Sequence, residues 1–180
     1  MQVVCISGKA GHGKDTFAAL MAESVKKRGK TVLIAHFADL LKYICKTFFR
    51  WDGIKDPYGR SLLQYVGTDV IRAQSPDYWA DFLAGILSMF HDEWDYVLIP
   101  DTRFPNEYEL LKHHDLPTSL VRIERPDYIS SLTSEQPYHS SETALDNYRY
   151  DFTITNTSLQ MLEVQADELI STLEFREAKP

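Results

Sequence analysis

The sequence predicts an α/β fold in which a parallel five-stranded sheet carries helices on both faces. Short apolar stretches alternate along the chain with segments whose apolar residues recur at helical spacing. Strands that are separated by helices are joined by right-handed crossovers and therefore run parallel. A glycine-rich segment, residues 8–16, stands between the first strand and the first helix, which is the arrangement of a phosphate-binding loop.

The five predicted strands are short and rich in branched or aromatic residues. They are residues 3–7, 31–36, 96–99, 119–123 and 150–155. The first two read as apolar runs without alternation, so we expect them to be buried on both faces of the sheet.

The predicted helices follow from apolar spacing and from start and stop signals. They are residues 14–28, 38–49, 61–73, 75–90, 106–114 and 159–173. Gly29 ends the first helix, and Ser75 with Pro76 marks the start of the fourth. We expect one domain, residues 1–180, in which residues 38–90 form a helical insert between the second and third strands.

Residues 126–142 form a long polar connection before the last strand. Loops of this length in compact domains commonly act as lids or binding loops, although an inert surface loop also fits.

Residues 8–16 carry the most specific signal, and we call them the phosphate loop. They are Gly8, Lys9, Ala10, Gly11, His12, Gly13, Lys14, Asp15 and Thr16. Glycines let main-chain N–H groups approach a phosphate, the following helix offers its N-terminus, and Lys14 can reach the β- and γ-phosphates. Asp15 stands where Ser or Thr usually follows the lysine, so either Asp15 or Thr16 could organise magnesium. Asp15 also fits a plain acidic residue at a helix start.

Further polar residues follow the predicted strands, at the edge where ligands of parallel sheets bind. Asp101 follows the third strand and is a candidate for a second magnesium-organising acid. Arg103 could clamp a phosphate bidentately or simply form a surface ion pair. Asp39 follows the second strand and could contact a ligand or stabilise a helix start.

Composition excludes several classes of function. The formal net charge of −7 argues against binding of polymeric nucleic acid, which needs basic stripes. Cys5 and Cys45 form no metal or disulfide motif. No apolar run is long enough to span a bilayer, and no export signal stands at the N-terminus, so we expect a cytoplasmic protein without membrane contact.

Short motifs throughout the chain together resemble one family. They are Gly13-Lys14-Asp15-Thr16, Phe37-Ala38-Asp39 with Leu41-Lys42, Leu62-Leu63-Gln64 with Gly67-Thr68-Asp69 and Arg72, Pro76-Asp77-Tyr78-Trp79, Asp101-x-Arg103-Phe104-Pro105-Asn106-Glu107, His139-x-Ser141-Glu142, and Asp151-x-x-Ile154-x-Asn156. In this order they resemble the phage-type deoxynucleoside monophosphate kinases, over roughly residues 3–170. The resemblance implies a three-layer P-loop kinase fold and transfer of the γ-phosphate of ATP, with magnesium, to a deoxynucleoside monophosphate.

The resemblance also implies roles for individual residues. Lys14, Asp15 and Arg103 would act in catalysis, and Asp15, Thr16 and Asp101 would serve the metal. The phosphate loop, Arg125 and Asn156 would bind ATP. The acceptor would be bound by Asp39, Lys42, Gln64, Thr68, Arg72, Arg103 and Glu142. Residues 126–148 contain no Lys or Arg, so a lid formed here would depend on Arg122 and Arg125 at its base.

Two other functions remain open at this point. A kinase for another small phosphorylated acceptor, such as phosphomevalonate, would use a similar loop ending in Gly-Lys-Asp. A nucleotide-binding module without turnover is the other alternative. The aromatic residues of the insert fit either a core or an interface in a homodimer.

Overall fold

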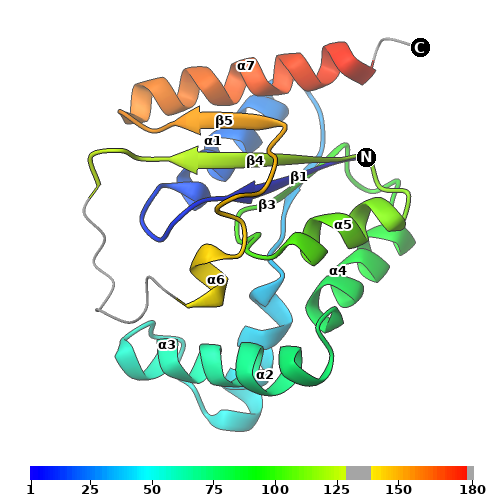
Figure 1. Ribbon diagram of the computed structural model, residues 1–180. Coiled ribbons are helices and arrows are strands. Elements are labelled where there is room, and N and C mark those ends of the chain that lie inside the picture. The colour runs from blue at the N-terminus through cyan, green and yellow to red at the C-terminus, as the bar shows by residue number, and fades with distance from the viewer. Residues whose placement is uncertain (129–138, 178–180) are drawn as a thin grey trace.

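The computed structural model describes residues 1–128 and 139–177 of the chain. Its five strands form one all-parallel sheet in the order β2-β3-β1-β4-β5, which confirms the predicted fold class (Figure 1). The strands are β1 Gln2–Ser7, β2 Val32–Ile34, β3 Tyr96–Ile99, β4 Thr118–Glu124 and β5 Phe152–Thr155. Most of the connection 126–142, which fits either a lid or an inert surface loop, lies outside the described residues.

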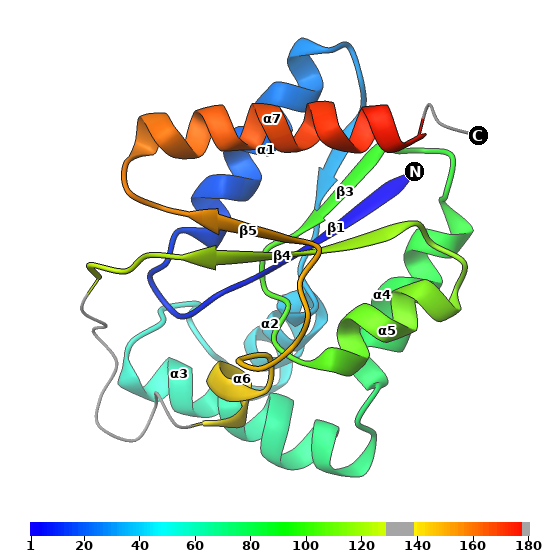
Figure 2. The ribbon, with the colours of Figure 1, turned by 45° about the horizontal axis from the view of Figure 1, so that its top comes forward.

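Helices cover both faces of this sheet. They are α1 Lys14–Lys27, α2 Ala38–Phe49, α3 Pro57–Gln64, α4 Tyr78–Met89, α5 Pro105–His113, α6 Ser140–Thr143 and α7 Leu159–Glu177, with a π-helix, Tyr65–Arg72, between α3 and α4. Helices α1 and α7 lie side by side on one face, and α4 and α5 lie on the other (Figures 1 and 2). Helices α2 and α3 extend away from the sheet at the bottom of Figure 1.

The alternation of side chains along β1 explains the two cores. Val4 and Ile6 point toward α1 and α7, whereas Val3 and Cys5 point toward the layer of α4 and α5. All four side chains are fully buried. A central parallel strand must be apolar on both faces, and this is why β1 shows no polar alternation.

The second strand differs from the prediction. It is shorter than residues 31–36 and lies at the edge of the sheet, where Val32 and Leu33 are only partly buried and Ile34 is 39% exposed. An apolar run does not reveal whether a strand has one neighbour or two, because that depends on the order of strands in space.

The helix predicted over residues 61–73 also differs. It begins earlier, at Pro57, where the Asp56 carboxylate accepts a hydrogen bond from the Gly59 N–H at 2.7 Å. After Gln64 it continues as a π-helix, in which each main-chain hydrogen bond spans five residues and not four. The buried Trp79 indole donates to the Gly67 carbonyl at 3.0 Å. A Cβ at Gly67 would lie 2.6 Å from a methyl carbon of Leu41, so a larger residue would have to displace that side chain.

The aromatic residues of the insert divide between core and surface. Trp51 and Trp79 are buried, whereas Tyr43, Phe48 and Tyr65 are each more than half exposed. Within the described ranges 1–128 and 139–177, no helix combines the length and the apolar character that crossing a bilayer requires.

Candidate active site

The phosphate loop leaves β1 and enters α1 at the carboxyl edge of the sheet. Gly8 has φ +145°, and a Cβ there would lie 2.5 Å from the main-chain oxygen of Ile123 in β4, so only glycine lets the two segments approach. Gly13 precedes the first residue of α1, and no side chain of the described residues caps this helix start. The N-terminal N–H groups of α1 therefore suit an anion.

Lys14 is buried beneath the loop. Its Nζ donates hydrogen bonds to the carbonyl oxygens of Gly8 at 2.8 Å and Lys9 at 3.0 Å. Burial lowers the pKa of Lys14 to about 8, and the positive charge of Arg103 acts in the same direction. Burial and Arg103 thus disfavour the charged form of the Lys14 amine, and a bound anion would favour it.

A pocket of about 400 Å³ opens beside the loop. It is lined by Gly11, Gly13, Lys14, Asp15, Thr16, Arg125, Asn156, Leu159 and Leu162. Arg125 and Asn156 contact the loop directly, since Arg125 donates to the Gly11 carbonyl at 3.4 Å and Asn156 donates to the His12 carbonyl at 2.9 Å. The structure thus gathers most of the predicted ATP-binding residues around one hollow.

Sequence reasoning missed the two leucines of this pocket. Leu159 and Leu162 belong to the apolar pattern of the last helix, which indicates packing. Leu162 is indeed buried, but Leu159 is 63% exposed although it is apolar. The signal that could have identified it is its place at the first turn of a helix that follows the carboxyl end of β5.

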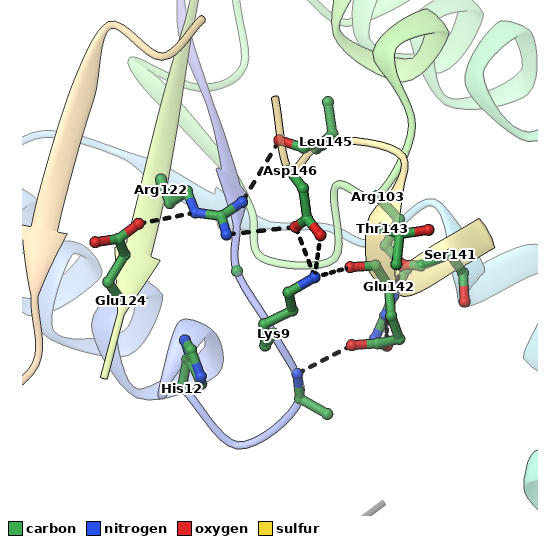
Figure 3. Close-up of polar contacts among 12 residues, drawn as sticks. Lys9, His12, Arg103, Arg122, Glu124, Ser141, Glu142, Thr143, Leu145 and Asp146 are labelled. Carbon is green, nitrogen blue, oxygen red and sulfur yellow. Dashed lines mark hydrogen bonds and ion pairs between the residues drawn. The ribbon is translucent and has the colours of Figure 1, made fainter. Parts of the chain in front are cut away.

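Glu142 lies against the phosphate loop from the other side (Figure 3). Its carboxylate forms an ion pair with the guanidinium of Arg103 and accepts a hydrogen bond from the Ala10 N–H at 3.2 Å. Its main-chain oxygen accepts a hydrogen bond from Lys9 Nζ at 2.5 Å. The Glu142 side chain is only 8% exposed, so this carboxylate is bound between a loop N–H and a cation.

A second set of charges ties the same segment to β4. Lys9 Nζ lies 2.6 Å from the carboxylate of Asp146, and Arg122 lies 3.4 Å from that carboxylate (Figure 3). Arg122 also pairs with Glu124 at 3.2 Å and donates to the Tyr150 hydroxyl at 2.9 Å. Arg122 is therefore occupied by neighbouring groups of its own chain, and Lys9 Nζ is bound by Glu142 and Asp146.

Asp101 links the end of β3 to the start of the insert. Its two carboxylate oxygens accept hydrogen bonds from the N–H groups of Phe37 and Ala38, each at 3.0 Å. These donors stand at the start of α2. Asp101 is thus committed to the helix start, a favourable place for an acidic group.

His36 stands between two predicted site residues. Its Nε2 lies 3.5 Å from Asp15 and its Nδ1 lies 3.4 Å from Asp39. The contact with Asp15 raises the pKa of His36 and lowers the pKa of Asp15. Asp39 also accepts hydrogen bonds from the His36 N–H at 3.0 Å and from Lys42 Nζ at 2.9 Å, so it joins the residues before α2 to Lys42.

Arg72 is brought from the insert to the turn that carries Arg103. Its Nη2 lies 2.6 Å from Glu107, and its guanidinium carbon lies 3.9 Å from the centre of the Phe104 ring. The carboxylate of Glu107 is buried, and burial raises its pKa to about 7 although Arg72 acts in the opposite direction. Sequence reasoning gave Glu107 no role of its own.

The remaining predicted acceptor residues lie farther along the insert. Gln64 ends α3 and Thr68 lies within the π-helix, and both are partly buried. Neither lines the pocket beside the phosphate loop. A second hollow of about 610 Å³ lies at the start of α4, where its lining includes Asp77 and Tyr78 of the motif Pro76-Asp77-Tyr78-Trp79.

Comparison with solved structures shows the fold. The APS kinase of Mycobacterium tuberculosis, solved with AMPPNP and APS, has a TM-score of 0.55 at 14% identity, over 96% of this chain and 97% of that chain. Shikimate kinase of Aquifex aeolicus has a TM-score of 0.53 at 12% identity, over 99% and 100%. Thymidylate kinase of Ehrlichia chaffeensis has a TM-score of 0.51 at 12% identity, over 94% and 98%. The chain therefore has the fold of P-loop kinases that act on small molecules.

Comparison of sequences shows the family. A search of curated proteins finds no match to this chain. Residues 52–165, more than half of the chain, match the family model for deoxynucleotide monophosphate kinase. This stretch contains Arg72, Arg103 and Glu142, and the phosphate loop precedes it. The chain therefore belongs to the deoxynucleotide monophosphate kinase family, whose members phosphorylate deoxynucleoside monophosphates with ATP.

Proposed function

We propose that phosphoryl transfer takes place between the phosphate loop and Arg103, at the position that the Glu142 carboxylate now marks. The observation that carries this proposal is the pair of contacts that Glu142 makes, one with Arg103 and one with the Ala10 N–H. A loop N–H and a guanidinium converge there on one anionic group. A phosphoryl oxygen, like a carboxylate oxygen, carries negative charge and accepts hydrogen bonds from such donors.

The ATP side of the site is the pocket of about 400 Å³. We propose that the loop N–H groups and Lys14 bind the phosphates. Arg125 and Leu159 would contact the base, and Asn156 would hold the loop through the His12 carbonyl. An apolar side chain beside a guanidinium suits an aromatic ring, which stacks on both.

The acceptor side is the edge where the insert meets β3. We propose Asp39, Lys42, Gln64 and Thr68 as contacts of the deoxynucleoside monophosphate. The acceptor residues expected from the sequence also include Arg72, Arg103 and Glu142. Arg103 and Glu142 lie beside the phosphate loop, whereas the guanidinium of Arg72 is held by Glu107 and Phe104.

Magnesium fits the donor set on the ATP side. Asp15 and Thr16 line the pocket and are exposed, so their oxygen atoms can face a cation that also touches phosphates. Each carboxylate oxygen of Asp101 already accepts one N–H, so we propose that Asp101 acts on the metal through water. When bound, magnesium would neutralise charge on the phosphates.

The protein itself would contribute position and charge. Phosphoryl transfer needs little covalent chemistry from side chains, so the main work is to align donor and acceptor and to balance the charge of the transferring group. Lys14 and Arg103 would hold the transferring oxygens from two sides. The segment of α6 that carries Glu142 would help to exclude water.

An acceptor panel tests this function. Purified protein is incubated with Mg·ATP and each of the four common deoxynucleoside monophosphates, 5-modified pyrimidine monophosphates and phosphomevalonate, and ADP formation is measured. We expect ADP formation that requires a deoxynucleoside monophosphate. Turnover with phosphomevalonate alone, or with none of the acceptors, would contradict the proposal.

We further propose a cytoplasmic location, in keeping with two cysteines that are both buried and free. Homodimer formation stays a prediction from the aromatic residues of the insert, and sedimentation of the purified protein would test it.

A further inference from the structure

Glu107 makes an unusual number of contacts for a buried acidic residue. Its side chain is 3% exposed. One carboxylate oxygen lies 2.6 Å from Arg72 Nη2, and the other accepts hydrogen bonds from the N–H groups of Arg103 at 2.7 Å and Phe104 at 3.0 Å. A single carboxylate therefore joins the π-helix of the insert to the main chain of Arg103.

The guanidinium of Arg72 makes several further contacts in this arrangement. Beside Glu107, it donates to the Pro76 carbonyl at 3.1 Å and to the Asn106 side chain at 3.3 Å. Its flat face covers the Phe104 ring at 3.9 Å. The Arg72 side chain is only 13% exposed. These contacts leave its guanidinium little freedom to turn toward a bound nucleotide.

Burial of this ion pair is costly, because both charges lose water. The start of α5 could be stabilised without burying an ion pair. An acid at the third position of a helix can accept the N–H of the preceding residues while it remains in water. The feature that burial adds is the link to Arg72, and this link fixes the turn 101–104 against the insert.

We propose that Glu107 is a positioning residue for phosphoryl transfer, and that Arg72 acts by neutralising Glu107 and not by contact with the acceptor. The inference rests on the proposed role of Arg103. Glu107 holds the main chain at Arg103 and Phe104, while Glu142 pairs with the Arg103 guanidinium at its other end. A shift of about 1 Å in a catalytic group can lower a rate by up to about a hundredfold.

A double-mutant cycle tests this inference. The variants are Glu107→Gln, Arg72→Met, Arg103→Ala and the two double variants that contain Arg103→Ala. We expect each of the first two to lower kcat about tenfold or more, with the KM for ATP unchanged. In the Arg103→Ala background the same substitutions should lower kcat less than about twofold, because the residue that they position is gone.

Asp95→Asn is the matched control. Asp95 also accepts a main-chain hydrogen bond, from the Thr31 N–H at 2.7 Å, but it precedes β3 at the opposite end of that strand. We expect its kcat to equal that of the unchanged protein. Melting temperatures of all variants are measured in parallel, and Arg72→Met completes the cycle if Glu107→Gln does not fold.

Three results would overturn the inference. Equal effects in both backgrounds would mean that Glu107 does not act through Arg103. A raised KM for the acceptor with unchanged kcat would make Arg72 a binding contact. Failure of both single variants to fold would assign the pair to folding alone. If the unchanged protein phosphorylates no acceptor, the proposed function fails instead, so the two failures are distinguishable.

Discussion

Arg103 and Glu142 form an ion pair although 39 positions separate them in the sequence, and the same Glu142 carboxylate accepts the Ala10 N–H at 3.2 Å. Three distant segments, the phosphate loop, the turn after β3 and α6, therefore meet around one negative charge (Figure 3). This arrangement places the Arg103 guanidinium beside the phosphate loop. It also means that a phosphate oxygen must compete with a carboxylate for the same donors.

Removal of the Arg103 guanidinium tests its role in the transition state. We expect Arg103→Ala to lower kcat by about 10²–10³, as loss of a charge partner for the transition state does. Steady-state ADP release with a saturating acceptor measures the effect. Arg149→Ala, which removes an exposed arginine outside the predicted site, should leave kcat unchanged. Equal losses in both variants would show that the effect of Arg103 is not local.

Substitution of Glu142 tests the competition with phosphate. Glu142→Gln keeps the size of the side chain and an oxygen for the Ala10 N–H, but it removes the negative charge beside Arg103. Because like charges at one site oppose binding, we expect the Kd for ATP to fall several-fold. Titration calorimetry measures this Kd. Weaker binding of ATP would mean instead that the carboxylate contributes directly to nucleotide binding.

Leu159 offers a test of the proposed base contact. Leu159→Ala should raise the KM for ATP several-fold and leave kcat and the melting temperature nearly unchanged, because the side chain is already 63% exposed. Met161→Ala is a suitable control, since Met161 is 47% exposed on the same helix and does not line the pocket. Similar KM values for the two variants would place the base elsewhere.

The pH dependence of ATP binding reports on Lys14. Burial lowers the pKa of Lys14 to about 8, so the amine loses its charge as the pH rises through 8. We expect the Kd for ATP to rise across this range, and a Lys14→Met variant to lack the step. A flat profile in the unchanged protein would contradict a phosphate contact by Lys14.

The stability of the folded protein should rise with pH over part of that range, whereas ATP binding weakens. Between about 8 and the ordinary value of 10.5, the unfolded chain holds a proton on Lys14 that the folded protein has released. The contribution of Lys14 to the free energy of unfolding therefore rises with pH in this window. Denaturant titrations of the unchanged protein and Lys14→Met separate this contribution from that of other groups.

Asp39 can act on the acceptor or on the start of α2. It accepts the His36 N–H at 3.0 Å and lies 2.9 Å from Lys42 Nζ. If it orients Lys42 for the acceptor, Asp39→Ala should mainly raise the KM for the monophosphate. An unchanged KM with a lower melting temperature would assign Asp39 to the helix start alone.

Several features could be predicted from the sequence because their causes are local. The phosphate loop is a continuous segment between a strand and a helix, and its glycines are required by close main-chain approaches such as that of Gly8 to Ile123. The parallel sheet follows from alternating strands and helices, and the family follows from short motifs in a constant order. The roles of the individual site residues stay predictions.

Other features depend on which distant segments meet. No local pattern in the sequence indicates the edge position of β2 or the π-helix at Tyr65–Arg72. Likewise, the apolar pattern around Leu159 indicates only packing, and the place of Leu159 after the carboxyl end of β5 becomes informative only in the folded sheet.

By itself, the sequence determined that this protein has a phosphate loop on a parallel sheet and gathers polar groups at one edge. Only the tertiary structure decided how those groups are paired. It turned Arg72 toward Glu107 and placed Glu142 between Arg103 and the phosphate loop. The physical reason is that ion pairs and buried hydrogen bonds act over a few ångströms in space, whereas their partners here lie 35 to more than 130 residues apart along the chain.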